Sequence, residues 1–282
     1  MPNMKLVFDF DGTITQKDTI STLAQSAIRF QKEKRRDGDA ADNLDVAWAE
    51  VVKAYVDDLK AYQEGFAPAA GERRTVEDEA ACLEGSKGLE MASLERLFGM
   101  GVEARRRGDV VIRRGFGDIV ALAEREGWET GIISVNWSRA FIEGVIHPLR
   151  MSGEVVANEV NPDGTIRGPE CLGGRPLTSS SGKKKVLNSS SGNHGSDSEA
   201  TQQDGRIIYF GDSPTDLECV VLGGAVIASS EEDSPLITSL RRVGLAVPHV
   251  SDCPDEGRGQ PKTYWARDFV EIEQSGVLGV SA

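Results

Sequence analysis

Histidine, cysteine and aromatic residues are scarce in this chain of 282 residues, which holds three histidines, four cysteines and 6% aromatic side chains. The cysteines are far apart and lack the paired spacing of a zinc site; they are Cys82, Cys171, Cys219 and Cys253. No serine or cysteine nucleophile motif accompanies the histidines. The sequence therefore does not favour zinc chemistry or hydrolysis by a Ser-His or Cys-His pair.

Positive charge and long apolar runs are also lacking. Lysine and arginine number 32 against 45 aspartates and glutamates, a net charge of −13. Such an acidic chain is a poor match for nucleic acid or for an anionic membrane surface. No apolar run approaches the length that spans a membrane, and no signal-peptide pattern is present. We expect a cytoplasmic protein in a reducing setting, and the 39% hydrophobic content is enough for a real core.

Two carboxylates, Asp9 and Asp11, stand immediately after a short apolar run, Lys5-Leu6-Val7-Phe8. That run predicts a buried strand, which Gly12 ends. The carboxyl ends of strands are where open α/β sheets bind ligands. One carboxylate could attack a phosphorus atom while the other moves a proton. An acidic turn that caps a helix explains the same residues equally well.

Helical periodicity follows over residues 17–108. One apolar face comprises Ile20, Leu23, Ala24, Ala27 and Ile28, and a longer stripe runs from Leu44 to Tyr62. Leu83, Leu94, Leu97 and Phe98 suggest one or two more helices before Gly99. We therefore predict a helical bundle inserted after the first strand.

Strands and helices alternate after that insert. Strands are predicted at 130–135, 206–210 and 225–228, with one helix at 116–126 before the first of them and another at 141–146 after it. A hairpin is predicted from Val155-Val156 and Thr165-Ile166, joined by the turn at residues 161–164. The alternation predicts an α/β fold: a Rossmann-like, mostly parallel sheet with helices on both faces. The core would comprise residues 1–16 and 109–282, and the bundle residues 17–108.

Residues 178–204 are rich in serine and glycine and poor in apolar side chains. This composition predicts a flexible loop within the core. A short helical island at Lys183–Leu187 is expected at its start.

Further polar residues fall at the same predicted sheet edge. Ser134 ends one buried strand, and Asp212 and Asp216 follow another in Gly211-Asp212-Ser213-Pro214-Thr215-Asp216. Four carboxylates in one crevice repel one another unless a cation lies between them, and hard oxygen ligands suit Mg²⁺. Helix capping is the alternative reading for Asp212 and Asp216.

The order of these motifs resembles that of the haloacid dehalogenase superfamily of phosphatases. The first motif, Asp-x-Asp-Gly-Thr with an apolar residue and Thr, is matched by Asp9 to Thr15. The second, a strand ending in Ser or Thr, is matched by Ser134, and the fourth, Gly-Asp-x-x-x-Asp, by Gly211 to Asp216. The third is a lysine near a helix, for which Lys183 fits best and Lys184 is the second choice. The helical insert resembles the cap of the phosphoserine-phosphatase-like branch.

The resemblance implies a role for each motif residue. Asp9 would be the nucleophile, and Asp11 the acid and base that serves the leaving group and water. Ser134 and Lys183 would hold phosphate oxygens, with backbone amides near Gly12 and Thr13. Mg²⁺ would be held by Asp9, the Asp11 carbonyl and Asp212, with Asp216 nearby. An acid at position 11 implies a phosphatase, because a halide leaves without a proton.

Two features bear on the substrate. Val135, Asn136 and Trp137 follow the second motif, where the branch usually has small glycines, so phosphoserine fits poorly. Asp18 stands where that branch often has an acid that contacts substrate, although it could equally cap the helix that starts near Ile20.

We therefore expect a Mg²⁺-dependent phosphatase of a small phosphorylated metabolite. A phosphomutase or phosphotransferase is the enzyme alternative, and a non-catalytic interaction protein that uses the helical insert is the alternative from another class.

Overall fold

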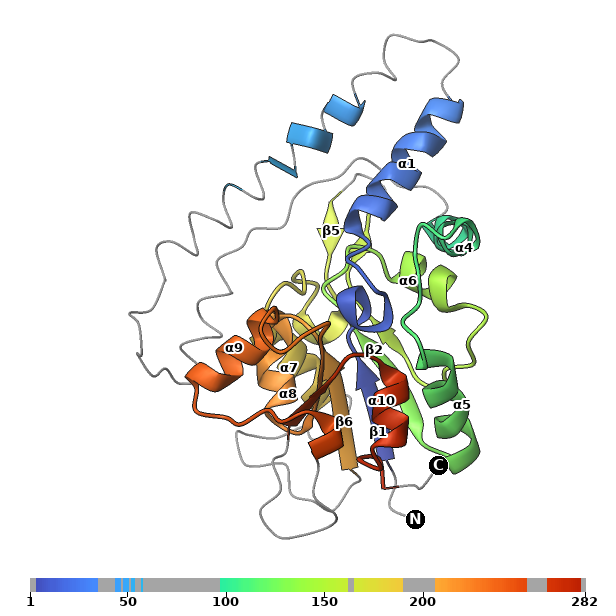
Figure 1. The fold of residues 1–282 in the computed structure, drawn as a ribbon. Helices are drawn as coiled ribbons and strands as arrows, with labels where there is room; N and C mark the ends of the chain where they lie inside the picture. Colours follow the sequence, from blue (N-terminus) through green and yellow to red (C-terminus); the bar gives the residue numbers. More distant parts are fainter. Residues whose placement is uncertain are drawn as a thin grey trace.

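The computed structural model describes residues 4–34, 44–46, 48–50, 52–53, 57, 97–161, 165–189, 206–252 and 263–279. Its centre is a six-stranded parallel sheet with the order β3-β2-β1-β6-β7-β8 (Figure 1). The strands are β1 (Met4–Phe8), β2 (Glu129–Ile133), β3 (Val155–Val156), β6 (Arg206–Gly211), β7 (Gly224–Ile227) and β8 (Thr263–Ala266). Two further strands, β4 (Glu159–Val160) and β5 (Ile166–Arg167), form a separate antiparallel pair. The predicted α/β fold with a Rossmann-like sheet is confirmed.

Helices flank the sheet on both faces. The longer helices of the described ranges are α1 (Ile20–Lys34), α4 (Leu97–Arg107), α5 (Phe116–Glu126), α6 (Arg139–Ile146), α7 (Ser180–Ser189), α8 (Leu217–Val220), α9 (Pro235–Arg242) and α10 (Phe269–Gln274), of which α1 extends away from the sheet (Figure 1). Short 3₁₀ turns lie at Glu170–Leu172, Pro214–Asp216 and Val250–Asp252. None of the helices in the described ranges is long and apolar enough to span a bilayer.

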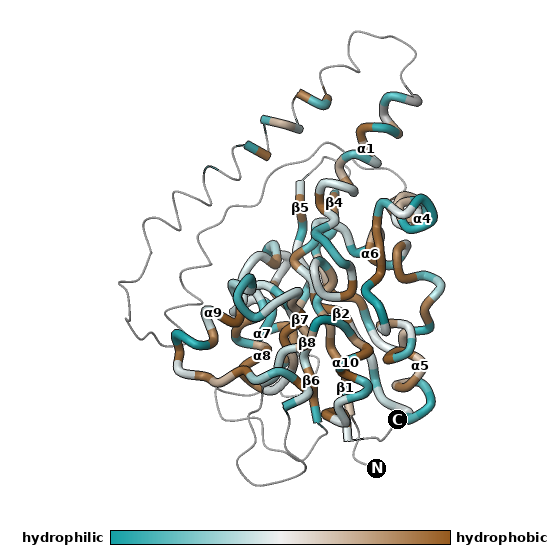
Figure 2. Tube along the Cα trace, viewed as in Figure 1, coloured by the Kyte–Doolittle hydropathy of each residue, from teal (hydrophilic) through white to brown (hydrophobic). Residues whose placement is uncertain are grey.

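The alternation of side chains along β1 divides the core in two. Leu6 and Phe8 pack with Phe116 of α5 and Phe269 of α10, while Val7 packs on the other face with the residues of α7, α8 and α9. Phe8 is fully buried and stacks on Phe210 with ring centroids 4.9 Å apart. In Figure 2 hydrophobic colour is gathered around the sheet, whereas α4 is mostly hydrophilic in colour.

The chain order reverses at β1, and this reversal positions the site. β2 and β3 lie on one side of β1, and β6, β7 and β8 lie on the other. Crossovers that leave in opposite directions open a crevice at the carboxyl end of the strands between them, where α/β proteins bind ligands. Asp9 is the residue that follows β1 at this point.

A wide turn, Phe10–Ile14, follows Asp9. Its Thr15 N–H donates to the Phe10 carbonyl over 3.0 Å, a bond that spans five residues instead of the four of an α-helix. Gly12 has a φ of 75°, which glycine adopts without the steric cost that a side chain would add. Wide turns of this kind are frequent at functional sites.

The predicted strands near residues 5–8, 130–135, 206–210 and 225–228 are confirmed, and so are the helices at 116–126 and 141–146. The predicted hairpin has the wrong pairing. Val155-Val156 pairs in parallel with β2 at the sheet edge, and Ile166 pairs with Val160. Asn161 closes the true hairpin through its N–H bond to the Thr165 carbonyl, so the partner strand is the one nearest that turn.

Most of the predicted cap, residues 17–108, lies outside the described residues, including Leu83 and Leu94. Within it the structure describes α1, short helical stretches at 44–46, 48–50 and 52–53, and α4. The expected helix end before Gly99 is wrong, because α4 begins at Leu97 and continues through Gly99 to Arg107.

Two glycines explain why α4 lies so close to α6. A Cβ atom at Gly144 would stand 2.1 Å from the Phe98 carbonyl oxygen, and one at Gly101 would stand 2.2 Å from that of Phe141. The contact therefore requires the absence of a side chain on both helices.

The serine-rich segment 178–204 begins as a helix. α7 extends beyond the predicted island at both ends, and Ser180, Lys183 and Leu187 are buried. Residues 190–205 lie outside the described residues, so the predicted loop is described only as far as Ser189.

Candidate active site

Lys183 and Asp9 form the centre of the site. The Lys183 Nζ lies 2.8 Å from Asp9 Oδ1 and 2.7 Å from Asp216 Oδ1, and the lysine is completely buried. α7 supplies the lysine, β1 leads into Asp9, and the turn after β6 supplies Asp216. A buried ammonium group in contact with two carboxylates fixes all three side chains relative to one another.

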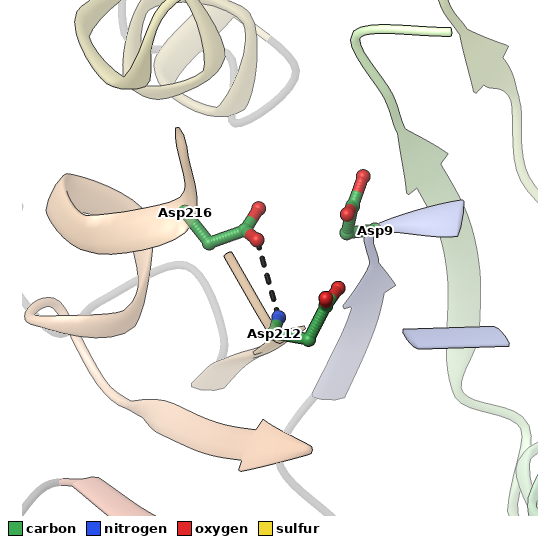
Figure 3. Close-up of side chains that lie close together, drawn as sticks. All are labelled: Asp9, Asp212 and Asp216. Atoms are coloured by element: carbon green, nitrogen blue, oxygen red, sulfur yellow. Dashed lines mark hydrogen bonds between the residues drawn. The ribbon is translucent and has the colours of Figure 1, made fainter. Parts of the chain in front are cut away.

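Asp216 accepts hydrogen bonds from more donors than Asp9 does. Its Oδ1 also accepts from the Tyr209 hydroxyl at 2.8 Å, and its Oδ2 accepts from the backbone N–H groups of Asp212 and Ser213. Figure 3 shows Asp216 reaching from its own turn to the Asp212 N–H, drawn as a dashed line. Asp216 thus organises the loop that follows β6.

Asp212 faces the turn that follows Asp9. Its Oδ1 accepts a bond of 2.7 Å from the Thr13 hydroxyl. A Cβ atom at Gly12 would lie 2.2 Å from Asp212 Oδ2, so glycine leaves the room that this carboxylate occupies. The Gly12 N–H itself donates to Thr15 Oγ1 at 3.2 Å.

Burial and mutual repulsion disfavour the ionised forms of these carboxyl groups. Burial and the neighbouring Asp216 raise the pKa of Asp212 to about 7. The same two causes raise the pKa of Asp9, while the charge of Lys183 opposes the shift. Burial opposes the charge of Lys183, but Asp216 and Asp9 outweigh it, so the pKa of this lysine lies above its ordinary value.

The donor set fits a hard divalent cation. One oxygen from each of Asp9, Asp212 and Asp216 lies within 4.8 Å of the others, and Figure 3 shows the three side chains around one space. Three carboxylates share one ammonium group here, and burial together with the charge of Asp216 raises the pKa values of Asp9 and Asp212. Carboxylate oxygens at this density are the ligands that Mg²⁺ takes in proteins.

Asp11 points into a different environment. Its Oδ1 accepts from the Thr19 N–H at 2.8 Å and the Thr19 hydroxyl at 2.6 Å, and its Oδ2 accepts from Asn136 Nδ2 at 2.7 Å. Burial, followed by the charge of Asp18, raises the pKa of Asp11 to about 6, against the opposing bonds from Thr19 and Asn136. A carboxyl group with such a pKa exchanges protons near neutral pH.

The residues after β2 have separate positions. Ser134 is fully buried, and its Oγ accepts from the Asn136 N–H at 3.1 Å. Val135 is half-buried, and its carbonyl accepts from Asn158 Nδ2. Trp137 is half-buried and contacts Trp48 edge to face, with ring centroids 6.1 Å apart.

The sequence left open which lysine lies in the site and whether Asp18 begins a helix, and the structure gives the contacts of both. Lys184 is half-buried and points to Glu218 at 3.4 Å, so Lys183 is the lysine that contacts Asp9. Asp18 is exposed, and its Oδ1 accepts from the Ile20 N–H at 2.9 Å, the local bond expected where a helix begins.

Sequence reasoning missed Arg113, which was not among the predicted site residues. The side chain is half-buried and donates to the carbonyls of Gly12 and Thr13 in the turn after Asp9. Its Nη1 also donates to the Arg267 carbonyl at 3.2 Å, in the loop after β8. The only signal in the sequence was that Arg113 lies just before the start of α5.

Tyr209, Thr19 and Asn158 were missed as well. Tyr209 looked like an apolar strand residue, although its hydroxyl contacts Asp216. Asn158 is buried, and its side chain donates to the carbonyls of Asn136 and Leu177 and accepts from the Leu177 N–H. Their bonds to Asp216, Asp11 and Asn136, respectively, span between 7 and 22 residues, across a turn or between separate elements, so no helix or strand periodicity marks these contacts.

Solved structures provide comparisons for the whole fold. A substrate-bound phosphoserine phosphatase complex is similar, with a TM-score of 0.51 and 14% identity over 96% of this chain and 97% of that one. A phosphoserine phosphohydrolase-like protein from Francisella tularensis subsp. tularensis SCHU S4 is also similar, with a TM-score of 0.51 and 16% identity over 96% and 98% of the two chains. At these identities the likeness concerns the fold. A search of curated proteins gives no significant match.

A family model described as haloacid dehalogenase-like hydrolase matches residues 6–220. The match runs from the central strand through the loop that carries Asp212 and Asp216, and it spans well over half of the sequence. The chain therefore belongs to the haloacid dehalogenase-like hydrolase family.

Proposed function

We propose that this protein is a Mg²⁺-dependent phosphatase that hydrolyses a small phosphorylated metabolite through an aspartyl-phosphate on Asp9. The observation that carries the proposal is the buried group of Asp9, Lys183, Asp212 and Asp216 at the end of the central parallel strand. A nucleophilic carboxylate beside a fixed cation and a cation site is the arrangement that phosphoryl transfer needs.

Asp9 and Asp11 divide the chemistry between them. Lys183 binds Oδ1 of Asp9, so Oδ2 is the atom proposed to attack phosphorus. As the new O–P bond forms, the bond to the leaving oxygen breaks, and that oxygen takes its electron pair and a proton from Asp11. Asp11 then accepts a proton from the water that attacks the aspartyl-phosphate, which releases phosphate and restores both side chains.

The remaining polar residues hold the phosphate and the metal ion. Ser134 and Lys183 would donate to phosphate oxygens, where preorganised donors stabilise the charge that develops. The carboxylates of Asp9 and Asp212 and the Asp11 carbonyl would hold Mg²⁺, which when bound neutralises phosphate charge. Asp216 already accepts from Lys183, Tyr209 and two backbone amides, which favours an indirect role near the ion.

The proposed substrate is small. Residues 17–108 are proposed as a cap over the core, and such a cap would exclude water and bulky substrates. The contact between Trp48, from this segment, and Trp137, beside the site, supports the proposal. The similar phosphoserine phosphatases support a small phosphate ester as the class, while Trp137 makes phosphoserine itself a poor fit.

The test is Mg²⁺-dependent phosphate release from a panel of phosphorylated metabolites by the wild type, by Asp9→Asn and by Asp109→Asn. Asp109 is an exposed residue outside the site and serves as the matched control. We expect loss of at least about 10³-fold in kcat for Asp9→Asn and no change for the control. Equal activity in the wild type and Asp9→Asn would reject Asp9 as the nucleophile. A phosphorylated organic product in place of free phosphate would indicate a phosphomutase or phosphotransferase.

A further inference from the structure

Asn136 has a partner for every polar atom of its side chain. Its Nδ2 donates to Asp11 Oδ2 at 2.7 Å and to Thr19 Oγ1 at 3.1 Å, and its Oδ1 accepts from the Ser138 N–H at 3.1 Å. The residue is fully buried. Both amide hydrogens are already used, so Asn136 could donate to a substrate only by giving up a bond to Asp11 or Thr19. The geometry therefore favours a role within the protein over contact with the substrate.

Both oxygens of Asp11 are held by uncharged donors, from one residue nearby in the chain and another far from it. Thr19, at the start of α1, donates twice to Oδ1, and Asn136, after β2, donates to Oδ2. Donors on both oxygens restrict the carboxyl plane to one orientation. Each oxygen keeps a second lone pair, on which the transferable proton can reside.

Asn136 is itself firmly anchored. Its N–H donates to Ser134 Oγ at 3.1 Å, and its carbonyl accepts from Asn158 Nδ2 at 3.2 Å. Asn158 also accepts from the Leu177 N–H at 2.6 Å, close to the start of α7. The amide that contacts Asp11 is therefore positioned by the strand end that carries Ser134 and by the segment that leads to Lys183.

We propose that Asn136, together with Thr19, is a positioning residue that orients the Asp11 carboxyl group toward the leaving oxygen. The proposal rests on the proposed phosphatase function. As the bond between phosphorus and the leaving oxygen breaks, that oxygen takes the electron pair and the Asp11 proton, which leaves Asp11 as a carboxylate. Asn136 touches neither phosphate nor metal and acts through Asp11 alone.

The nature of the leaving group tests this role. The leaving group of an aryl phosphate such as p-nitrophenyl phosphate is a phenolate, which is stable without a proton. The leaving group of an alkyl phosphate such as glycerol 2-phosphate is an alkoxide, which needs the proton. We expect Asn136→Ala to lower kcat/KM about 10²-fold with the alkyl ester, because general acid catalysis is worth at least that factor, and a few-fold at most with the aryl ester. The ratio kcat/KM is compared because it reports the steps up to departure of the leaving group, before Asp11 acts as a base toward water. A purely structural role would lower both rates by the same factor.

A double-mutant cycle checks that the effect passes through Asp11. In the Asp11→Asn background, Asn136→Ala should cause no further loss with the alkyl ester, since the proton donor is already gone. Additive losses would overturn the proposal. So would a raised KM with unchanged kcat in the single variant, which would indicate substrate binding.

Thr19 provides a second pair of variants in case Asn136→Ala does not fold. Thr19→Val removes the hydroxyl donor to Asp11, and Thr19→Ser retains it. Thr19→Val should show the same selective loss with the alkyl ester, and Thr19→Ser should restore the wild-type ratio. Phosphate release by the wild type separates the two levels: absence of any release rejects the phosphatase itself, whereas an active wild type with equal losses on both esters rejects only the positioning role.

Discussion

Asp9 and Asp11 are two residues apart, yet they lie in opposite kinds of environment. Asp9 contacts a buried ammonium group and shares its space with two further carboxylates. Asp11 contacts only uncharged donors among the described side chains, two from Thr19 and one from Asn136. The first region is held by charge, and the second by hydrogen bonds.

The difference comes from the strand that precedes them. After β1 the backbone enters the turn Phe10–Ile14 between the two residues, so that Asp9 contacts Lys183 near Asp216 while Asp11 faces the end of β2 and the start of α1. Neighbouring residues can therefore carry different chemistry when a turn sends them to different elements. Each of the following predictions tests one side of this division.

Removal of the buried ammonium group should have the largest effect. Lys183→Met leaves Asp9 and Asp216 without their shared cation, so we expect a loss of about 3–5 kcal/mol in the free energy of unfolding. The rate of phosphate release should fall by about 10²–10³-fold, because a preorganised donor is lost. Lys185→Met is the control, since Lys185 is exposed on the same helix. Similar stability in both variants would show that charge does not hold the Asp9 region.

The pH dependence of stability should come next. The pKa of Asp212 in the folded chain is about 7, above the ordinary value, so the folded state retains a proton that the unfolded chain has lost. The free energy of unfolding contributed by this group is therefore full below about pH 4 and falls as pH rises to about 7, by at most about 4 kcal/mol. Urea unfolding of the wild type and Asp212→Asn with a chelator present measures it, and the difference between the two should fall across this window. A difference that rises with pH contradicts the charge repulsion inferred here.

Mg²⁺ should reverse much of that loss at neutral pH. At a concentration about 100 times its Kd, a bound ion stabilises the fold by about 2.7 kcal/mol, which raises Tm by about 5 °C. Asp212→Asn should lose most of this shift, and Asn136→Ala should retain it, because Asn136 is not among the proposed ligands. Equal shifts in all three proteins would place the ion elsewhere.

The smallest effect should come from the close contact between α4 and α6. Gly144→Ala forces a Cβ against the Phe98 carbonyl, so α4 and α6 must separate, at a cost of about 1–3 kcal/mol. Gly99→Ala is the matched change on α4, because a Cβ there meets no described atom within 4 Å, and it should stabilise by up to about 1 kcal/mol. Thermal unfolding measures both, and a stable Gly144→Ala protein would show that the two helices can move apart freely.

The strands could be predicted because each is a continuous apolar run. β1, β2, β6 and β7 are buried on both faces, so their residues need no partner to be recognised. β8 was missed, since its four residues, Thr263–Ala266, follow a polar stretch and give a short signal. The hairpin was paired wrongly because Val155-Val156 has the same apolar character at a sheet edge as it would have in a hairpin.

The acidic residues of the site could be predicted as a set because parallel strands bring their ends to one edge. The bonds that distinguish them could not. Asn136 and Asp11 are separated by 125 residues, and Thr13 and Asp212 by 199, so no local pattern records either contact. Arg113 shows the same limit, because a basic residue on a surface and one that binds carbonyl groups look identical in sequence.

The Arg113 contact also indicates how much of the chain a working enzyme requires. Every motif of the family lies within residues 6–220, yet Arg113 reaches the Arg267 carbonyl, and the Phe269 N–H donates to the Arg114 carbonyl. A fragment that ends at residue 220 would contain all of the proposed site residues. It would lack the Arg267 carbonyl that helps to fix Arg113 against the turn after Asp9. The segment that the family model matches is thus shorter than the segment whose contacts hold the turn after Asp9.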